Sequence, residues 1–559
     1  MAAAGGERMA MADERDTTVT APVPADALPG GPARTETAPG PAAPLETVSP
    51  YVRTAPAPLA SARTGAVRAG LDTEAPSRRK PARPGRRGRA RLLRRITAFL
   101  LVSAVIATGG ATAPVREAPG WASPGLVGGG GWPFTGVPLP PDLAEGASYL
   151  PDSSAVRLAD GRVRLVPSGG ERPVTVDADD PRVAQAVRHD QAWLARGTVP
   201  DGGVDPATGA DPGFRDMSAR ALLDLRLLTR PNGASLASWY SKWRYTWPRD
   251  SAFAVAAFTV TGHPTEARRI LGFFSRVQNE DGMWAARYNP DGSAVSDGRA
   301  AQLDSLGWML WATWFYSHHH PQEEGDLPDL WPMVERAADH LARSLDAEGL
   351  PPASSDYWER DPRGEQDPRR PTLGVVAPVL AGLRSAADLA GRRGDGVKAA
   401  QWRQAARRVS DAVDRQFAPY GYPRSPVSGG LMDTSVTFLA PPFADARPDV
   451  TAAIADAARK QALPNGGVLP GERWAGAQDV AWTPEVAMFG LAAAASGRTG
   501  DALRRLSWLS AHRTSLGVLP EKVGPTGMPA GPAPLGWTAA LVLLSLSAME
   551  KPLPVPPAD

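Results

Sequence analysis

The hydrophobic residues of this chain recur with the period of an α-helix over most of its length. From residue 181 to residue 549, apolar positions return every three or four residues, as on the buried face of a helix, and few stretches alternate like a strand. The pattern predicts twelve helices, at residues 182–196, 217–228, 250–261, 264–277, 302–317, 329–346, 372–390, 397–417, 449–462, 481–496, 500–512 and 535–549.

A short connector that recurs between these helices indicates how they are joined. Gly262 ends one predicted helix and Glu266 begins the next, and Gly497 and Asp501 repeat this arrangement. Glycine suits the residue after a helix because it accepts left-handed backbone angles, and an acid in the first turn interacts favourably with the helix dipole. Twelve helices joined in pairs predict six helical hairpins.

The connectors between hairpins favour a closed ring over an open solenoid, which is the alternative. Four of them are long and irregular, at residues 279–300, 351–371, 418–433 and 463–480. Loops of this length in a compact domain are usually functional. We therefore predict an all-α fold, an (α/α)6 toroid of helical hairpins, as a catalytic domain over residues 181–549.

The pattern upstream of this domain is different. Residues 1–95 are rich in Ala and Pro with one aromatic residue, so we predict a disordered basic tail; residues 550–559 are expected to form a second disordered tail. Residues 96–113 carry no charge and follow ten basic residues, which predicts a transmembrane anchor or the apolar region of a signal peptide. Residues 114–180 are expected to form a Gly/Pro-rich linker with short hairpins.

Either interpretation of residues 96–113 places the helical domain outside the cytoplasm. With a retained anchor, the protein is a single-pass protein of the cell membrane; with cleavage, it is secreted. The expected partners are therefore a substrate and a membrane.

Composition narrows the possible chemistry. The chain has no cysteine, which excludes disulfides, thiolate metal sites and cysteine nucleophiles. Its formal charge of +2 argues against a nucleic-acid partner. His318, His319 and His320 close a predicted helix, where cations are favourable, so we expect no metal site there. We expect no cofactor.

Aromatic and ionic residues alternate in two segments that the helix pattern leaves at a helix start or in a loop. Trp247 precedes Pro248, Arg249 and Asp250, and Trp358 precedes Glu359 and Arg360. Aromatic rings stack on the C–H faces of sugars, and charged groups bind sugar hydroxyls. These segments indicate a carbohydrate site.

Two glutamates are candidates for acid–base chemistry at such a site. Glu359 lies beside Tyr357 and Trp358, whose rings would desolvate its carboxyl and raise its pKa, as a general acid requires. Glu521 lies in a loop just before the last predicted helix. Inverting hydrolysis of a glycoside needs two carboxyl groups about 6.5–9.5 Å apart, one protonating the leaving oxygen and one activating water.

Four segments together resemble the glucoamylase-type glycosidases of glycoside hydrolase family fifteen. They are WRYTWPRDSAF from Trp243, QLDSLGW from Gln302, DYWER from Asp356, and LPEKV…TG…PLGW from Leu519 to Trp537. The resemblance spans residues 217–549. It implies a six-hairpin toroid, release of a β-configured sugar from the non-reducing end of an α-glucan or α-glucoside, and no metal.

The resemblance also implies roles for individual residues. Glu359 would be the general acid and Glu521 the general base. Substrate-binding positions would be Trp247, Arg249, Asp250, Asp304, Trp358, Arg360 and Trp537. The sequence departs from the family in the charged stretch 361–370 and in lacking Ser-His after Trp537. A membrane-tethered glycan-binding protein with a degenerate glycosidase pocket and no turnover is therefore the alternative hypothesis.

Overall fold

The computed structural model describes residues 146–166, 168, 173–205, 207–239, 243–320 and 327–558. The predicted N-terminal tail and the apolar segment 96–113 lie outside these residues. Within them, the chain is mostly helical, and the fold predicted from the sequence, a toroid of helical hairpins, is confirmed.

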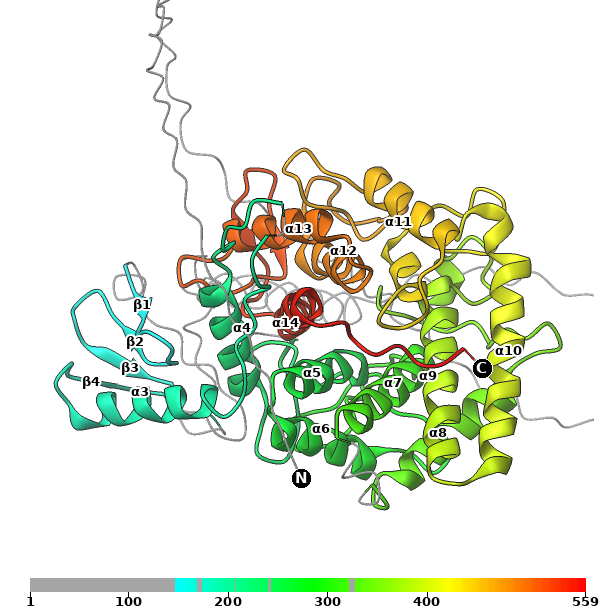
Figure 1. Cartoon of the computed structure of the whole chain (residues 1–559), viewed down its shortest axis with the longest axis horizontal. Helices are drawn as coiled ribbons and strands as arrows, with labels where there is room; N and C mark the ends of the chain where they lie inside the picture. Colours follow the sequence, from blue (N-terminus) through cyan, green and yellow to red (C-terminus); the bar gives the residue numbers. More distant parts are fainter. Residues whose placement is uncertain are drawn as a thin grey trace, which may run out of the picture. The chain divides into compact units, whose positions relative to one another are not determined.

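Six inner elements close the ring. In chain order each contacts the next, and the last contacts the first, which makes the ring closed and excludes the open solenoid. In Figure 1, α14 is seen end-on, and α4, α5 and α12, which contact it, lie around it. The inner elements are α5 (Pro248–Val260), α7 (Asp304–His319), α9 (Leu373–Arg392), the 3-10 helix η6 (Thr434–Leu439), α12 (Thr483–Ala495) and α14 (Gly536–Glu550).

Each inner element is preceded in the chain by an outer helix, so that the ring consists of six pairs. The outer helices are α4 (Arg215–Leu228), α6 (Pro264–Val277), α8 (Trp331–Ser344), α10 (Gly396–Gln416), α11 (Pro448–Lys460) and α13 (Thr499–Ala511). The inner helices are apolar on nearly every face because they are enclosed; every residue from Thr483 to Ala494 is buried. Outer helices such as α6 bury one stripe of residues and expose the rest.

The ring differs from the predicted pairing in one respect. All twelve predicted helices exist, but the first, α3 (Pro181–Leu194), stands outside the ring. The inner position between α9 and α12 is filled by η6, which was not predicted. Its six residues, Thr434–Leu439, are all buried, and six residues are too few to show a helical period.

A small sheet lies beside α3 and α4 (Figure 1). It is an antiparallel meander of β1 (Ser148–Tyr149), β2 (Val156–Arg157), β3 (Val163–Leu165) and β4 (Val174–Val176). Val156 and Leu158 share a buried cluster with Leu227 and Leu228, so the sheet covers the outer side of α4. The first pair of the ring is therefore shielded from solvent.

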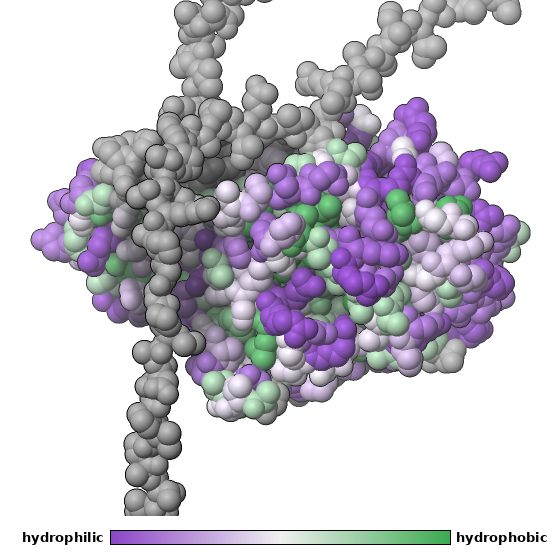
Figure 2. Space-filling model, turned by 90° about the horizontal axis from the view of Figure 1, so that it is seen from above, coloured by the Kyte–Doolittle hydropathy of each residue, from purple (hydrophilic) through white to green (hydrophobic). Residues whose placement is uncertain are grey.

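The surface of the described part is largely hydrophilic. Figure 2 shows a face on which polar side chains predominate and apolar ones form small separate areas. Among the described residues one helix, α9, is long and apolar enough to cross a membrane, but 89% of its apolar window is buried in the ring. It is therefore a core helix.

The C-terminal residues follow α14 as an extended segment along the ring (Figure 1). The sequence predicted a disordered tail over residues 550–559. In the structure, Leu553 packs against the main hydrophobic core and Pro556 is buried.

Candidate active site

Several of the candidate residues lie at the N-terminal ends of inner helices. Because each outer helix returns the chain to the same side, the inner helices run in one direction and their first turns gather at one end of the ring. Arg249 and Asp250 are in the first turn of α5, which begins at Pro248. Asp304 is the first residue of α7, and Trp537 the second residue of α14.

Arg249 is the centre of an ionic cluster. Its side chain is 3% exposed. Nη1 donates a hydrogen bond of 2.7 Å to Oδ2 of Asp304, and Nη2 donates one of 2.7 Å to Oε1 of Glu359. Nε lies 3.9 Å from Oδ2 of Asp250. Three predicted site residues therefore surround a fourth.

The two aspartates of this cluster have raised pKa values. Burial raises the pKa of Asp304 to about 7, against the opposing effect of the Arg249 charge. Burial likewise raises the pKa of Asp250 to about 6, again opposed by Arg249, and the nearby charges of Glu359 and Glu521 raise it further. Glu359 pairs with Arg249 in the first turn of α5, and Glu521 accepts a hydrogen bond from Trp243 just before that helix, so both candidate catalytic residues lie near the start of α5.

Glu359 is held by polar donors on both carboxylate oxygens. Besides Arg249, Gln302 Nε2 donates a 2.9 Å hydrogen bond to Oε1, and Arg299 pairs with Oε2. The backbone of Glu359 has φ of 55°, a left-handed conformation that is uncommon for a residue other than glycine.

The rings of Tyr357 and Trp358, just before Glu359 in the chain, contact residues other than Glu359. Tyr357 donates a hydrogen bond of 3.0 Å to Asp433, and Trp358 lies under the guanidinium of Arg424 at 3.8 Å. The sequence predicted that these rings surround the Glu359 carboxyl. The structure instead places arginine and glutamine side chains around it.

Glu521 is buried in a small three-stranded sheet next to the ring. Strands β5 (Ala481–Trp482), β6 (Lys522–Val523) and β7 (Pro529–Ala530) form this sheet, and Glu521 immediately precedes β6. The residue is 5% exposed. Trp243 Nε1 donates a 3.0 Å hydrogen bond to Oε1, and Lys522 Nζ lies 3.2 Å from Oε2. The carboxylate is thus oriented by an indole and an ammonium group.

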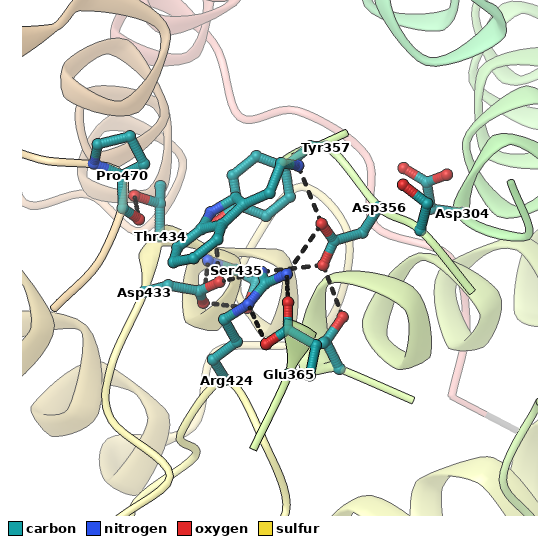
Figure 3. A network of polar contacts seen from close by, with 12 residues as sticks. Asp304, Asp356, Tyr357, Glu365, Arg424, Asp433, Thr434, Ser435 and Pro470 are labelled. Atoms are coloured by element: carbon teal, nitrogen blue, oxygen red, sulfur yellow. Dashed lines mark hydrogen bonds and ion pairs between the residues drawn. The ribbon is translucent and has the colours of Figure 1, made fainter. Parts of the chain in front are cut away.

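A second buried arginine organises the loop that carries Glu359. Arg424 donates through Nη1 to Asp433 at 2.7 Å and through Nη2 to Glu365 at 2.8 Å, and it pairs with Asp356 at 2.9 Å (Figure 3). Burial would raise the pKa of Asp356, but the Arg424 charge holds that pKa below its usual range. Asp356 then accepts from the backbone N–H of Trp358 at 2.9 Å, which fixes the loop just before Glu359.

The remaining candidates are Trp247, Arg360 and Trp537, which differ in the residues that they contact. The Trp537 ring lies 5.8 Å from the guanidinium carbon of Arg249 and 6.3 Å from the ring of Tyr357. Trp247 contacts Tyr245 and the guanidinium of Arg287. The guanidinium of Arg360 lies over the ring of Trp474 at 4.4 Å.

Sequence reasoning missed several residues of the site. Those that contact the two glutamates are Trp243, Arg299 and Gln302. Gln302 stood inside a recognised motif, but nothing local marked Arg299. Glu485, at the start of α12, was also missed; it is 4% exposed, and burial raises its pKa to about 8, with a further contribution from nearby Glu521.

Metal ligation has little support in the described part of the chain. No group of three or more His, Asp or Glu side chains there has an arrangement that could hold a metal ion. The histidines at the end of α7 stack instead on aromatic rings of the same helix, as His318 does on Trp314 and His319 on Phe315.

The closed ring of helical hairpins, with buried carboxylates and arginines at one end, can now be compared with known proteins. Residues 215–440 match the family described as Glycosyl hydrolases family 15. An uncharacterized glycosyl hydrolase of Methanocaldococcus jannaschii is 31% identical over 130 residues, which is 22% of this chain and 20% of the relative. The resemblance predicted from the sequence is confirmed over residues 215–440, where the chain is similar to Glycosyl hydrolases family 15.

Solved structures support the fold. A wild-type glycosidase is similar with a TM-score of 0.51 and 22% identity, over 64% of this chain and 98% of that one. A bacterial glucoamylase complexed with acarbose gives a TM-score of 0.51 and 16% identity, over 69% of this chain and 64% of that one. Glucoamylase from Saccharomycopsis fibuligera gives 0.50 and 14%, over 63% of this chain and 97% of that one.

Proposed function

We propose that the protein is an inverting, exo-acting α-glycosidase that hydrolyses α-glucosidic bonds of oligo- or polysaccharides from the non-reducing end. Glu359 acts as the general acid and Glu521 as the general base. The observation that carries this proposal is that Glu359 pairs with Arg249 in the first turn of α5 while Glu521 accepts a hydrogen bond from Trp243, five residues before that helix. The family match supports the same chemistry.

The surrounding residues have matching roles in this proposal. Asp250 and Arg249 are placed to bind hydroxyls of the terminal sugar, because both lie in the first turn of α5 beside Glu359. Trp537 supplies an aromatic face next to Arg249. Trp243 orients the Glu521 carboxylate through its indole N–H. Oε2, which lies 3.2 Å from Lys522 Nζ and accepts no hydrogen bond from a described residue, is the oxygen that would take the proton of a water molecule.

A second function is favoured by one specific observation. Both carboxylate oxygens of Glu359 already accept hydrogen bonds from Arg249, Arg299 and Gln302. The acid must exchange one of these donors for a glycosidic oxygen before it can act. A membrane-tethered glycan-binding protein without turnover would keep them.

Hydrolysis of defined α-glucosides by the purified full-length chain, with the anomer of the first product identified by NMR, separates the two functions. The enzyme hypothesis expects β-anomer, and loss of hydrolysis in both Glu359→Gln and Glu521→Gln. Saccharide binding without any turnover in the wild type would support the binding protein instead. The α-anomer as first product would contradict inversion.

We also propose that the catalytic domain lies outside the cytoplasm, attached to the cell membrane through residues 96–113. The uncharged run after ten basic residues supports this placement. Protease accessibility of the helical domain in intact cells would test it.

A further inference from the structure

A cavity of about 460 Å³ lies at the other end of α5 from the candidate catalytic residues. Residues of α3, the end of α4 and the turn between α5 and α6 line it. Asp250 is in the first turn of α5, whereas the cavity-lining Gly262 follows the last, and thirteen helical residues span about 20 Å. The volume falls within the range of small-molecule sites, so this is a candidate site separate from the carboxylate cluster.

The lining of this cavity is strongly cationic. Four arginines line it, against one carboxylate, that of Glu266; of the two histidines in the lining, His263 is neutral at pH 7 because burial lowers its pKa to about 4. That carboxylate is already engaged, because it accepts a 2.9 Å hydrogen bond from the indole of Trp193. The positively charged residues are Arg196, Arg226, Arg230 and Arg269, and the histidines are His189 and His263.

Two of the arginines are available for a ligand. Arg226 forms an ion pair with Asp190 at 2.9 Å, so its charge is largely compensated. Arg196 and Arg269 are exposed and form no ion pair with any described residue. Two uncompensated guanidinium groups facing one cavity favour an anion.

Buried polar groups in the cavity wall point the same way. His263 is 3% exposed and stacks on Trp193 at 3.9 Å, yet its Nε2 has no hydrogen-bond partner among the described residues. His263 is also the residue before α6, whose start has no side-chain cap, and Thr265 in its first turn lines the cavity. The free N–H groups and positive dipole of a helix start favour anions.

We propose that this cavity binds a small anion that carries a phosphate group. A guanidinium presents a planar pair of N–H donors that matches two phosphate oxygens, and Arg196 and Arg269 supply two such pairs beside the start of α6. The phosphate group belongs either to a free molecule or to a lipid headgroup. The site does not depend on the proposed hydrolase activity.

Titration calorimetry of the full-length chain in detergent tests the proposal, with inorganic phosphate as the probe. Arg196→Gln/Arg269→Gln is compared with a matched control, Arg407→Gln/Lys551→Gln, which removes two exposed charges outside the cavity lining. We expect saturable binding by the wild type and the control, and affinity lower by about tenfold or more in the cavity variant.

A second titration with dihexanoyl phosphatidylglycerol, kept below its micellar concentration, distinguishes a lipid headgroup from a free phosphate. Binding of either probe that depends on Arg196 and Arg269 supports the site and identifies its source. Absence of saturable binding of both probes, or equal weakening in the two double variants, overturns the proposal. Circular dichroism verifies that each variant is folded.

Discussion

Arg249 and Arg424 are both buried and each meets three carboxylates, yet the two clusters differ in how completely they are satisfied. All three guanidinium nitrogens of Arg424 donate hydrogen bonds, and the ring of Trp358 covers its face. In the other cluster, Nε of Arg249 and Oδ1 of Asp304 are buried without a hydrogen-bond partner among the described residues.

The difference separates a structural cluster from one suited to a substrate. Unsatisfied buried polar atoms cost stability and are found mainly where function requires them. Exposure does not separate the two clusters, since the side chains of Glu359 and Glu365 are 10% and 9% exposed. The Arg424 cluster leaves no guanidinium nitrogen without an acceptor and fixes the loop on which Glu359 stands.

The largest expected effect that tests this comparison is on hydrolysis. Glu359→Gln removes the proposed acid from the Arg249 cluster, and we expect kcat to fall by about 10²- to 10⁴-fold. Glu365→Gln, six residues later, changes the Arg424 cluster and serves as the matched control, with kcat within a few-fold of wild type. Equal losses of kcat in the two variants would contradict the division of roles. Steady-state kinetics on one α-glucoside measures both.

Replacing Arg424 should have the largest effect on the free energy of unfolding. Arg424→Met leaves three carboxylates buried without a countercharge, so we expect the free energy of unfolding to fall by about 3–5 kcal/mol. Urea denaturation followed by circular dichroism measures the change. The exposed Arg407→Met is the control. A loss of stability no greater than that of the control would show that the cluster is not structural.

A smaller loss of stability is expected for Glu365→Gln itself. The amide keeps one oxygen acceptor for Arg424 but removes a charge that the guanidinium contacts through two nitrogens. We expect the free energy of unfolding to fall by about 1–3 kcal/mol. The same urea experiment gives the value, and a more stable variant would contradict the assigned role.

Glu485 extends the comparison to a buried carboxyl without an arginine. Its pKa is raised from 4.5 to about 8, so between these values the folded protein holds a proton that the unfolded chain releases. The free energy of unfolding should therefore fall as pH rises through this window. In Glu485→Gln that contribution is absent, so its stability relative to wild type should increase from pH 5 to pH 9.

Urea denaturation at pH 5, 7 and 9 measures this effect. Glu365→Gln is the control because that carboxyl has an arginine partner. A constant difference between wild type and Glu485→Gln across the three pH values would show that Glu485 does not titrate in this range.

Local patterns in the sequence predicted the outer helices and five of the six inner elements of the ring, but not η6. Outer helices such as α6 show a clear hydrophobic period, and inner helices such as α12 are apolar runs of thirteen or more residues, whereas η6 has six residues and shows neither signal. The amphipathic α3 has the same period as the ring helices, so periodicity could not reveal that it packs beside a sheet. In this chain the local sequence indicates whether a segment is helical, but it does not indicate which other element that segment packs against.

The same limit applies to the site. The motifs that contain Arg249, Asp304 and Glu359 predicted residues that the structure brings into contact. The surroundings of Glu359 could not be inferred from its neighbours, because the three side chains that contact its carboxyl lie at least 57 residues away in the chain. Its partner Arg299 and the loop-fixing Arg424 lie about sixty residues away in opposite directions along the chain, where no local pattern connects them.

Helices α7 and α9 approach each other without an intervening layer of side chains. A Cβ atom at Gly307 would lie 2.1 Å from the carbonyl oxygen of Pro378, and one at Gly382 would lie 2.6 Å from Cα of Gly307. For protein engineering, this part of the ring wall therefore offers no positions to randomise. Libraries that seek new substrate preferences should keep these glycines and vary the loops that precede the inner helices.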